Sequence, residues 1–273
     1  MAQGMKHLFR NPIFLSGFFI IFFIAFVCVF APFITSYNPN AINLKEALLS
    51  PSSRHLLGTD TLGRDLLARL LYGGRVSLAV GFVAVGISVL IGVALGSIAG
   101  FYGGVIDEII SRFIDIMLCF PSFFLILSLV ALARHPSLYI IMAIIGFTSW
   151  MSPARLIRAE ILSLRQRNFV IAALSCGLSQ RRVIMRHIIP NAWGPVMVNA
   201  TLSMAVAVLI ESSLSFLGLG VQPPQASWGN ILLEAKECLG VGWWMSVFPG
   251  LAIFFTVLGL NLIGEGIRES LHK

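Results

Sequence analysis

The sequence predicts an all-α integral membrane protein with about six transmembrane helices. Of its 273 residues, 57% are hydrophobic and only 11% are charged, and the mean hydropathy is +0.89. A soluble domain carries about 25% charged residues, so a chain with so little charge cannot cover a water-facing surface. Because the hydrophobic segments run along nearly the whole chain, we expect a single membrane domain.

The first apolar segment covers residues 13–34 and contains no charged residue. Its length of about 20 residues or slightly more is enough to cross a bilayer. Lys6 and Arg10 precede it, as in a signal peptide, but no A-x-A-like cleavage site ends it. We therefore expect a retained membrane anchor that follows a cytoplasmic N-terminus of residues 1–12.

An amphipathic helix is expected in the external loop that follows the first span. Arg64, Asp65 and Arg69 lie toward one face of this helix, and a row of leucines lies toward the other. Thr59 or Asp60 can cap its start. Such a helix is expected to lie at the membrane surface. The leucines of its apolar face are Leu62, Leu66, Leu67, Leu70 and Leu71.

Five further apolar segments predict the remaining spans. In the second span, Gly92 and Gly96 form a G-x-x-x-G pattern, which lets helices approach closely. A short charged turn follows, in which Arg112 can reach Glu108 or Asp115 at helical spacing and form surface ion pairs. The five segments cover residues 76–101, 116–133, 138–153, 193–216 and 241–263.

The largest basic concentration lies between the fourth and fifth spans, in residues 155–190. Seven arginines stand there against one acid, Glu160. Basic residues near span ends stay on the cytoplasmic side, so we expect this loop to be cytoplasmic and, with six spans, both termini as well. The basic residues of the first external loop run against this rule and are Lys45, Arg54, Arg64, Arg69 and Arg75.

The basic loop is predicted to hold two helices separated by a glycine turn. A helix is expected over residues 159–176, and Gly177 fits its C-terminal stop. Ser179 can cap a second short helix, which Pro190 is expected to end. A helix pair of this kind suits the docking of another protein. The alternative is a basic tether that only meets lipid headgroups.

The segment ALSCGLSQRRVIMRHIIPN resembles the cytoplasmic signature EAA-x3-G-x9-I-x-L-P of binding-protein-dependent ABC importer permeases. In that family the element is the coupling helix, which sits in a cleft of the ATP-binding subunit. Ile171 stands where the family has Glu, which weakens any charge-pairing role of that position but not the docking shape. The matching residues are Ile171, Ala172, Ala173, Gly177, His187, Ile189 and Pro190.

Four other segments are similar to the C-type subunit of the dipeptide, oligopeptide and nickel branch of this family. They cover residues 55–78, 100–123, 211–229 and 259–271, so the resemblance extends over nearly the whole chain. Near the end, the acidic pair of the branch is Glu265 and Glu269 rather than Asp. The resemblance implies the type I ABC importer permease fold with a cytoplasmic coupling helix. Its parts are the permease core 76–265 with the coupling loop 155–190, preceded by residues 13–75 and followed by a cytoplasmic tail 266–273.

The resemblance also implies a multi-subunit importer in the inner membrane of a bacterial cell. Two different but homologous permease subunits, two ATP-binding subunits and an external substrate-binding protein are expected, with membrane lipid around them. No G-x-x-x-x-G-K-[ST] loop occurs in this chain, so ATP and Mg²⁺ are expected in the partner subunits and no cofactor here. The cargo is a di- or oligopeptide, with nickel or another metal chelate as the alternative.

This chain lacks the residues that other classes of membrane protein need. An intramembrane enzyme would need a catalytic constellation, but neither H-E-x-x-H nor G-x-S-x-G occurs. A secondary transporter often shows repeated halves and midplane charges, whereas this chain shows no clear repeat and one acid well inside a predicted span, Glu211. The four cysteines are far apart and predict no metal site. The net charge of +7 sits mostly in loops and predicts no nucleic-acid binding.

Glu211 allows two interpretations. A charge inside a span costs at least about 2.5 kcal/mol, so its side chain should face protein or water. It can line the pore and contact a charged substrate, or it can serve as a structural acceptor for Ser212, Ser213 or a partner chain.

Overall fold

The computed structural model describes residue 8, residues 11–133 and residues 137–272. Lys6 and Arg10 lie outside the described residues. Within these ranges the chain is helical, and Thr59 and Asp65 form one isolated β-bridge. The α-helices are α2 (Pro12–Val29), α3 (Ala31–Ile34), α4 (Leu66–Tyr102), α5 (Gly104–Leu118), α6 (Ser122–Leu132), α7 (Leu138–Thr148), α8 (Met151–Arg165), α9 (Asn168–Ser175), α10 (Gln180–Val183), α11 (Ile189–Phe216), α12 (Trp228–Ala235) and α13 (Trp244–His272). Short 3₁₀ turns cover Leu44–Glu46 and Lys236–Cys238, and a π-helical turn covers Ile184–Ile188.

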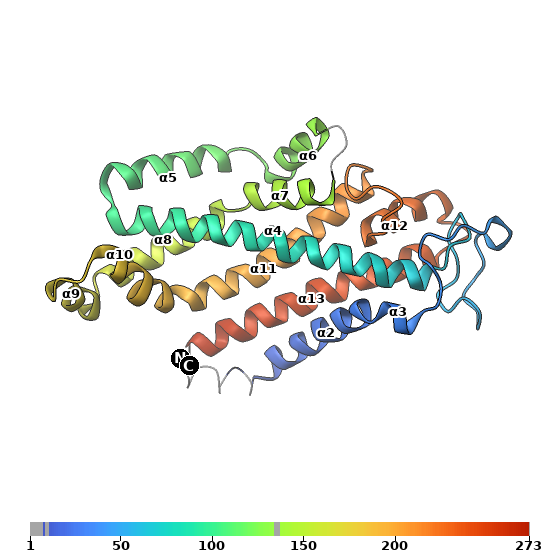
Figure 1. Ribbon diagram of the computed structural model, residues 1–273, viewed down its shortest axis with the longest axis horizontal. Coiled ribbons are helices and arrows are strands. Elements are labelled where there is room, and N and C mark those ends of the chain that lie inside the picture. The colour runs from blue at the N-terminus through green and yellow to red at the C-terminus, as the bar shows by residue number, and fades with distance from the viewer. Residues whose placement is uncertain (1–7, 9–10, 134–136, 273) are drawn as a thin grey trace.

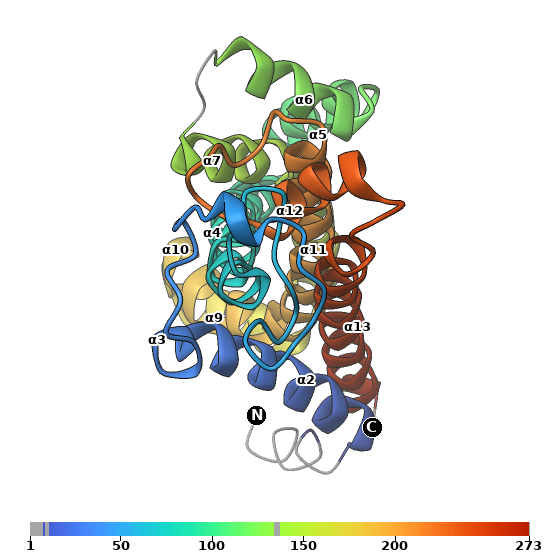
Figure 2. The ribbon, with the colours of Figure 1, turned by 90° about the vertical axis from the view of Figure 1, so that its right-hand side faces the viewer.

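The predicted membrane architecture is confirmed. The described residues contain 5 helices that are long and apolar enough to cross a membrane, or up to 6 if the bent pair α5 and α6 counts as one span. Figure 1 shows α9 and α10 at one end of the molecule, and α12 with the loop of residues 35–65 at the other. In Figure 2, α4 and α11 lie between α5–α7 on one side and α2 and α13 on the other.

The first span, α2, packs closely against the last one, α13. Asn11 caps α2 by accepting from the backbone N–H of Ile13 at 2.9 Å, and its amide donates to Glu269 near the end of α13 at 2.8 Å. A Cβ placed on Gly17 would lie 2.6 Å from the carbonyl oxygen of Gly259. Close approach of the two helices therefore requires a residue without a side chain at this position.

The predicted surface helix before the second span does not form as a separate element. It is the first part of α4, which runs without interruption over 37 residues. Asp65 caps this helix by accepting from the backbone N–H of Ala68 at 2.8 Å, so the cap is neither Thr59 nor Asp60. Arg64, Asp65 and Arg69 are buried, because side chains of the loop of residues 35–65 and of α12 pair with them.

The charged turn expected after the second span is also helical. It forms α5, whose apolar and polar residues fall on opposite faces. The third span is therefore broken: α5 and α6 meet at an angle of 82°. Pro121 at the start of α6 lacks a backbone N–H and disfavours helical geometry in the residue before it, which explains the break.

The helices of the basic loop differ from those predicted. α8 ends at Arg165 and α9 begins at Asn168, so residues 159–176 do not form one helix. Pro190 does not end a helix but stands in the first turn of α11, where its missing N–H is tolerated. The π-helical turn just before it lets the chain continue from α10 into α11, with the N–H of Ile189 bonded to the carbonyl of Ile184.

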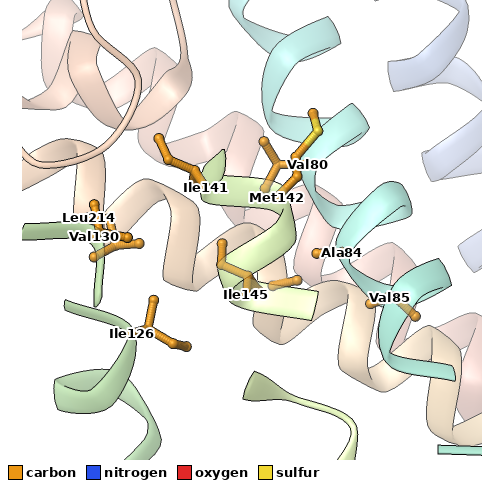
Figure 3. Close-up of a cluster of buried hydrophobic side chains, with 10 residues drawn as sticks. Val80, Ala84, Val85, Ile126, Val130, Ile141, Met142, Ile145 and Leu214 are labelled. Atoms are coloured by element: carbon orange, nitrogen blue, oxygen red, sulfur yellow. The ribbon is translucent and has the colours of Figure 1, made fainter. Parts of the chain in front are cut away.

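The core consists of apolar side chains from α4, α6, α7 and α11. Figure 3 shows this cluster, in which Val80 and Ala84 of α4 and Ile141 and Ile145 of α7 are almost fully buried. Leu214 of α11 and Val130 of α6 belong to the same cluster and lie close to each other in Figure 3. Since four helices contribute, the cluster fixes their relative positions around the middle of the molecule.

Candidate functional site: an exposed helix at one end of the bundle

The helix α9 is held at the end of the molecule by its inner face. Val170 is 0% exposed and Ala173 is 7% exposed, and both belong to an apolar cluster with residues of α4, α8, α10 and α11. Phe101 of α4 and Ile161 of α8 are among them. The cluster packs α9 against the ends of α4, α8 and α11, three helices that belong to candidate membrane spans.

The outer face of α9 has no partner within the described chain. Ile171 is 51% exposed and Ala172 is also exposed. Gly177 follows with φ +77°, a left-handed conformation that favours glycine, and a Cβ placed there would meet no atom within 4 Å. These three residues offer a shallow surface that a second protein can approach without displacing a side chain of this chain.

The structure separates the seven residues of the predicted coupling signature. Ile171, Ala172 and Gly177 lie at the surface, whereas Ala173 packs inward. The other three are half-buried, in the π-helical turn and the first turn of α11, and they are His187, Ile189 and Pro190. The first group can contact a partner, and the second connects the surface to α11.

Ion pairs between α5 and α8 stabilise the base of this end. Arg158 pairs with Asp107, and Arg155 pairs with Asp115. Arg165 donates to the carbonyl oxygen of Phe101 at 2.9 Å. Helical spacing predicted that Arg112 pairs with Glu108 or Asp115. In the structure Arg112 lies 3.9 Å from Glu108, whereas Asp115 pairs with Arg155. The pairing between helices was missed because nothing in the linear spacing shows that α5 and α8 are neighbours.

Glu211 is fully buried inside the subunit. Its carboxylate accepts from the hydroxyls of Ser77 on α4 and Ser215 on α11, each at 2.8 Å. Ser77 also accepts from the backbone N–H of Trp228, and Ser215 accepts from that of Val221. In this conformation Glu211 is a structural acceptor that joins α4, α11 and the segment before α12.

A cluster of largely buried ion pairs lies at the end of the molecule opposite α9. Arg64 pairs with Asp60 at 2.6 Å and with Glu234 of α12 at 2.7 Å. Arg69 contacts the same two acids. The Nδ1 atom of His55 lies 2.9 Å from the carboxylate of Asp65, and its Nε2 atom lies 3.7 Å from that of Glu46. Two cations and two anions thus close a neutral ring that joins the first external loop to α12.

The chain matches the profiles of two protein families. Residues 92–273 match the family described as binding-protein-dependent transport system inner membrane component. Residues 1–51 match the N-terminal TM domain of oligopeptide transport permease C. The two matches leave out residues 52–91 and together cover most of the chain.

Curated relatives match over almost the full length. The dipeptide transport system permease protein DppC of Alkalihalophilus pseudofirmus is 40% identical over 98% of this chain and 88% of its own length. The oligopeptide transport system permease protein OppC of Haemophilus influenzae is 39% identical over 98% of this chain and 87% of its own. The probable D,D-dipeptide transport system permease protein DdpC of Escherichia coli is 40% identical over 96% and 87%, respectively.

Solved structures show the same fold. The inward-facing MetNI methionine ABC transporter aligns with a TM-score of 0.57 at 18% identity, over 74% of this chain and 95% of the other. An amino acid ABC transporter solved with histidines aligns with a TM-score of 0.54, also at 18% identity, over 75% and 94%. At this identity the likeness concerns the arrangement of helices.

Proposed function

This chain belongs to the family of binding-protein-dependent transport system inner membrane components, and from this membership we propose that it forms half of the translocation pathway of an ATP-driven importer of di- and oligopeptides. The observation that carries the proposal is near full-length similarity to relatives named for dipeptides and oligopeptides. Those names favour peptides over nickel or another metal chelate. The subunit itself is a non-catalytic, multi-pass component of the inner membrane.

The partners proposed for this subunit are those that the family organisation implies. A second, homologous permease completes the pathway as a heterodimer, and an external binding protein delivers the peptide. Two ATP-binding subunits, which hold ATP and Mg²⁺, dock at the end that carries α9. This end then faces the cytoplasm, and both termini lie on the cytoplasmic side.

The packing of α9 supports a mechanism for coupling. Closure of the ATP-binding subunits pulls on the surface formed by Ile171, Ala172 and Gly177. Because Val170 and Ala173 are packed among residues of α8 and α11, the pull is transmitted to these helices as a unit. Their ends then rock between two arrangements, one open inward and one open outward, and ATP binding at the partner biases that equilibrium.

A pull-down of the assembled complex tests docking at α9. We would co-express the chain with the neighbouring permease and ATP-binding subunits and compare wild type with Ala172→Asp and Gly177→Asp. Both variants add charge and volume at exposed positions, so co-purification of the ATP-binding subunits should fall at least about 10-fold, which corresponds to about 1.4 kcal/mol. Ser163→Asp, an exposed position on α8, is the matched control and should retain them.

Uptake into proteoliposomes tests the energy source and the cargo. The complex should accumulate a labelled dipeptide only with ATP on the α9 side and binding protein on the other. Accumulation driven by an ion gradient without ATP would overturn the proposal in favour of a secondary transporter. Accumulation of a nickel chelate but of no peptide would overturn the assigned cargo.

A further inference from the structure

A hollow of about 350 Å³ opens between α5–α6, the junction of α7 with α8, and α11. Ala84, Val85 and Ile145 of the core cluster in Figure 3 form its apolar floor. Asn199 to Ile210 of α11 pass along it, close to the middle of that helix. The hollow therefore lies at the depth of the bilayer interior and not at either end of the molecule.

Hydroxyl and amide side chains line this hollow, and none of its lining residues is charged. Side chains that hydrogen-bond are disfavoured against hydrocarbon, and they are tolerated at this depth where they meet protein or water. Six of them gather here from α6, α7, α8, α11 and the short connection between α7 and α8. They are Ser122, Thr148, Ser149, Ser152, Asn199 and Ser203.

Two interruptions of membrane-crossing helices meet at the same hollow. Leu118 and Ser122 line it from the two sides of the 82° bend between α5 and α6. Thr148 and Met151 line it from the two sides of the break between α7 and α8. Broken helices at membrane depth are tolerated where their free backbone groups face protein or a water-filled cavity, and they commonly form substrate sites.

Asn199 supplies an acceptor that lacks a donor. Its Oδ1 is enclosed and has no hydrogen-bond partner among the described residues, while its Nδ2 lies 3.5 Å from the hydroxyl of Ser152. An amide oxygen left without a donor inside a protein is unfavourable. A rotation of the Asn199 side chain toward the hollow would let a backbone N–H of a passing peptide, or water, supply the missing donor.

The hollow continues toward the end that carries α9. A second hollow, of about 500 Å³, shares Asn199 and Leu202 with the first and is also lined by Glu160 of α8 and Arg268 of α13. The two hollows thus follow one face of α11. Of these two hollows, only the one nearer α9 is lined by charged groups.

From these observations we propose that the hollow around Asn199 is the peptide-contacting wall of the translocation pathway, and that Asn199 and the surrounding hydroxyls bind the peptide backbone. This inference rests on the proposed function. Every peptide carries the same backbone N–H and C=O groups, so uncharged donors and acceptors can pass peptides with different side chains. A charged wall would instead favour one class of side chain.

Charge selectivity of uptake tests the role of Asn199. In the reconstituted importer, Asn199→Asp should slow uptake of a dipeptide with an acidic side chain at least about 5-fold relative to one with a basic side chain, since like charges repel in a narrow passage. Asn199→Ala should slow all dipeptides alike. Wild type should show little preference between the two dipeptides when saturated with binding protein.

Thiol accessibility gives a second measurement that does not depend on transport. In a chain with Cys119→Ser and Cys176→Ser, a small water-soluble thiol reagent should modify Ser203→Cys and Ser152→Cys in the assembled importer, and bound peptide should protect them. The matched control is Ser128→Cys, an exposed position on α6 outside the hollow, which should react slowly and without protection.

The outcomes separate this inference from the function on which it rests. If wild type imports peptides but Asn199→Asp shows no change in selectivity and Ser203→Cys behaves like Ser128→Cys, the wall lies elsewhere and the importer assignment stands. If wild type with all partners imports no peptide, the proposed function itself fails. Equal modification of all three cysteines without protection by peptide would also overturn the inference.

Discussion

Arg64 and Arg69 carry positive charge into the interior of one end of the protein, where two carboxylates neutralise it. Their side chains are 7% and 2% exposed, and Asp60 and Glu234 each contact both of them. This pairing explains how two guanidinium groups can be buried inside the protein, because each meets two carboxylates.

Removal of one acid should expose the cost of this arrangement. Asp60→Asn leaves two buried arginines with one carboxylate, so we expect a loss of about 3–5 kcal/mol in the free energy of unfolding. Thermal unfolding in detergent, followed by size-exclusion chromatography, measures the change. Glu108→Gln removes an acid from the exposed pair with Arg112 and should shift the midpoint little. Equal shifts in the two variants would contradict the role of the cluster.

Backbone strain, and not lack of space, should decide which substitutions Gly177 tolerates. Its φ is +77° and the space around it is open, so Gly177→Val should cost about 1–2 kcal/mol locally whereas Gly177→Asn should cost much less. Hydrogen exchange of residues 168–180 measures the local opening. Similar protection in both variants would show that the turn is not held in the left-handed region.

At the residue scale, the sequence predicted local turns better than the burial and the partners of individual side chains. The turn at Gly177 was expected, since a glycine after a short helix predicts such a stop. The burial of Arg69 was not, because its partner Glu234 lies 165 residues away. Asn199 gave no signal, because one amide in an apolar segment has no pattern.

The elements were predicted well where apolar length alone decides. Five of the six predicted spans correspond to long apolar helical segments, which lie in α2, α4, α7 with α8, α11 and α13. The prediction failed where a helix is interrupted or extended. Pro121 was expected within a span and marks a sharp bend instead, while Pro190 was expected to end a helix and starts one.

The close contact between α2 and α13 predicts that a larger residue at Gly17 displaces α2. Gly17→Val places atoms against the backbone of α13, since even a Cβ would lie 2.6 Å from the carbonyl oxygen of Gly259. We expect α2 to separate from the bundle, with a loss of about 1–3 kcal/mol from overpacking. Limited proteolysis near residue 35 and thermal unfolding measure it. Gly86→Val, where a Cβ meets nothing within 4 Å, is the control, and equal effects would argue against close packing.

The whole molecule has two chemically different ends. One carries α9, the start of α2 and the end of α13, and the other carries the loop of residues 35–65 and α12 (Figure 1). The common location of the α2 start, the α13 end and α9 agrees with an even number of crossings, with the broken pair α5 and α6 counted as one. Arg181 and Arg182 of α10 lie at the end that carries α9, which the proposed orientation places in the cytoplasm.

The cysteines of the chain allow a direct test of this orientation. Cys176 is exposed beside Gly177, whereas Cys28 and Cys238 are buried, and burial raises the pKa of the Cys238 thiol, which lowers its reactivity. With Cys119 replaced by Ser, a membrane-impermeant maleimide should label Cys176 in inside-out vesicles at least about 10-fold faster than in intact spheroplasts, because only the first preparation exposes the cytoplasmic face. Co-expressed ATP-binding subunits should slow that labelling by covering α9. Faster labelling in spheroplasts would place α9 outside the cell, which would exclude docking of ATP-binding subunits there.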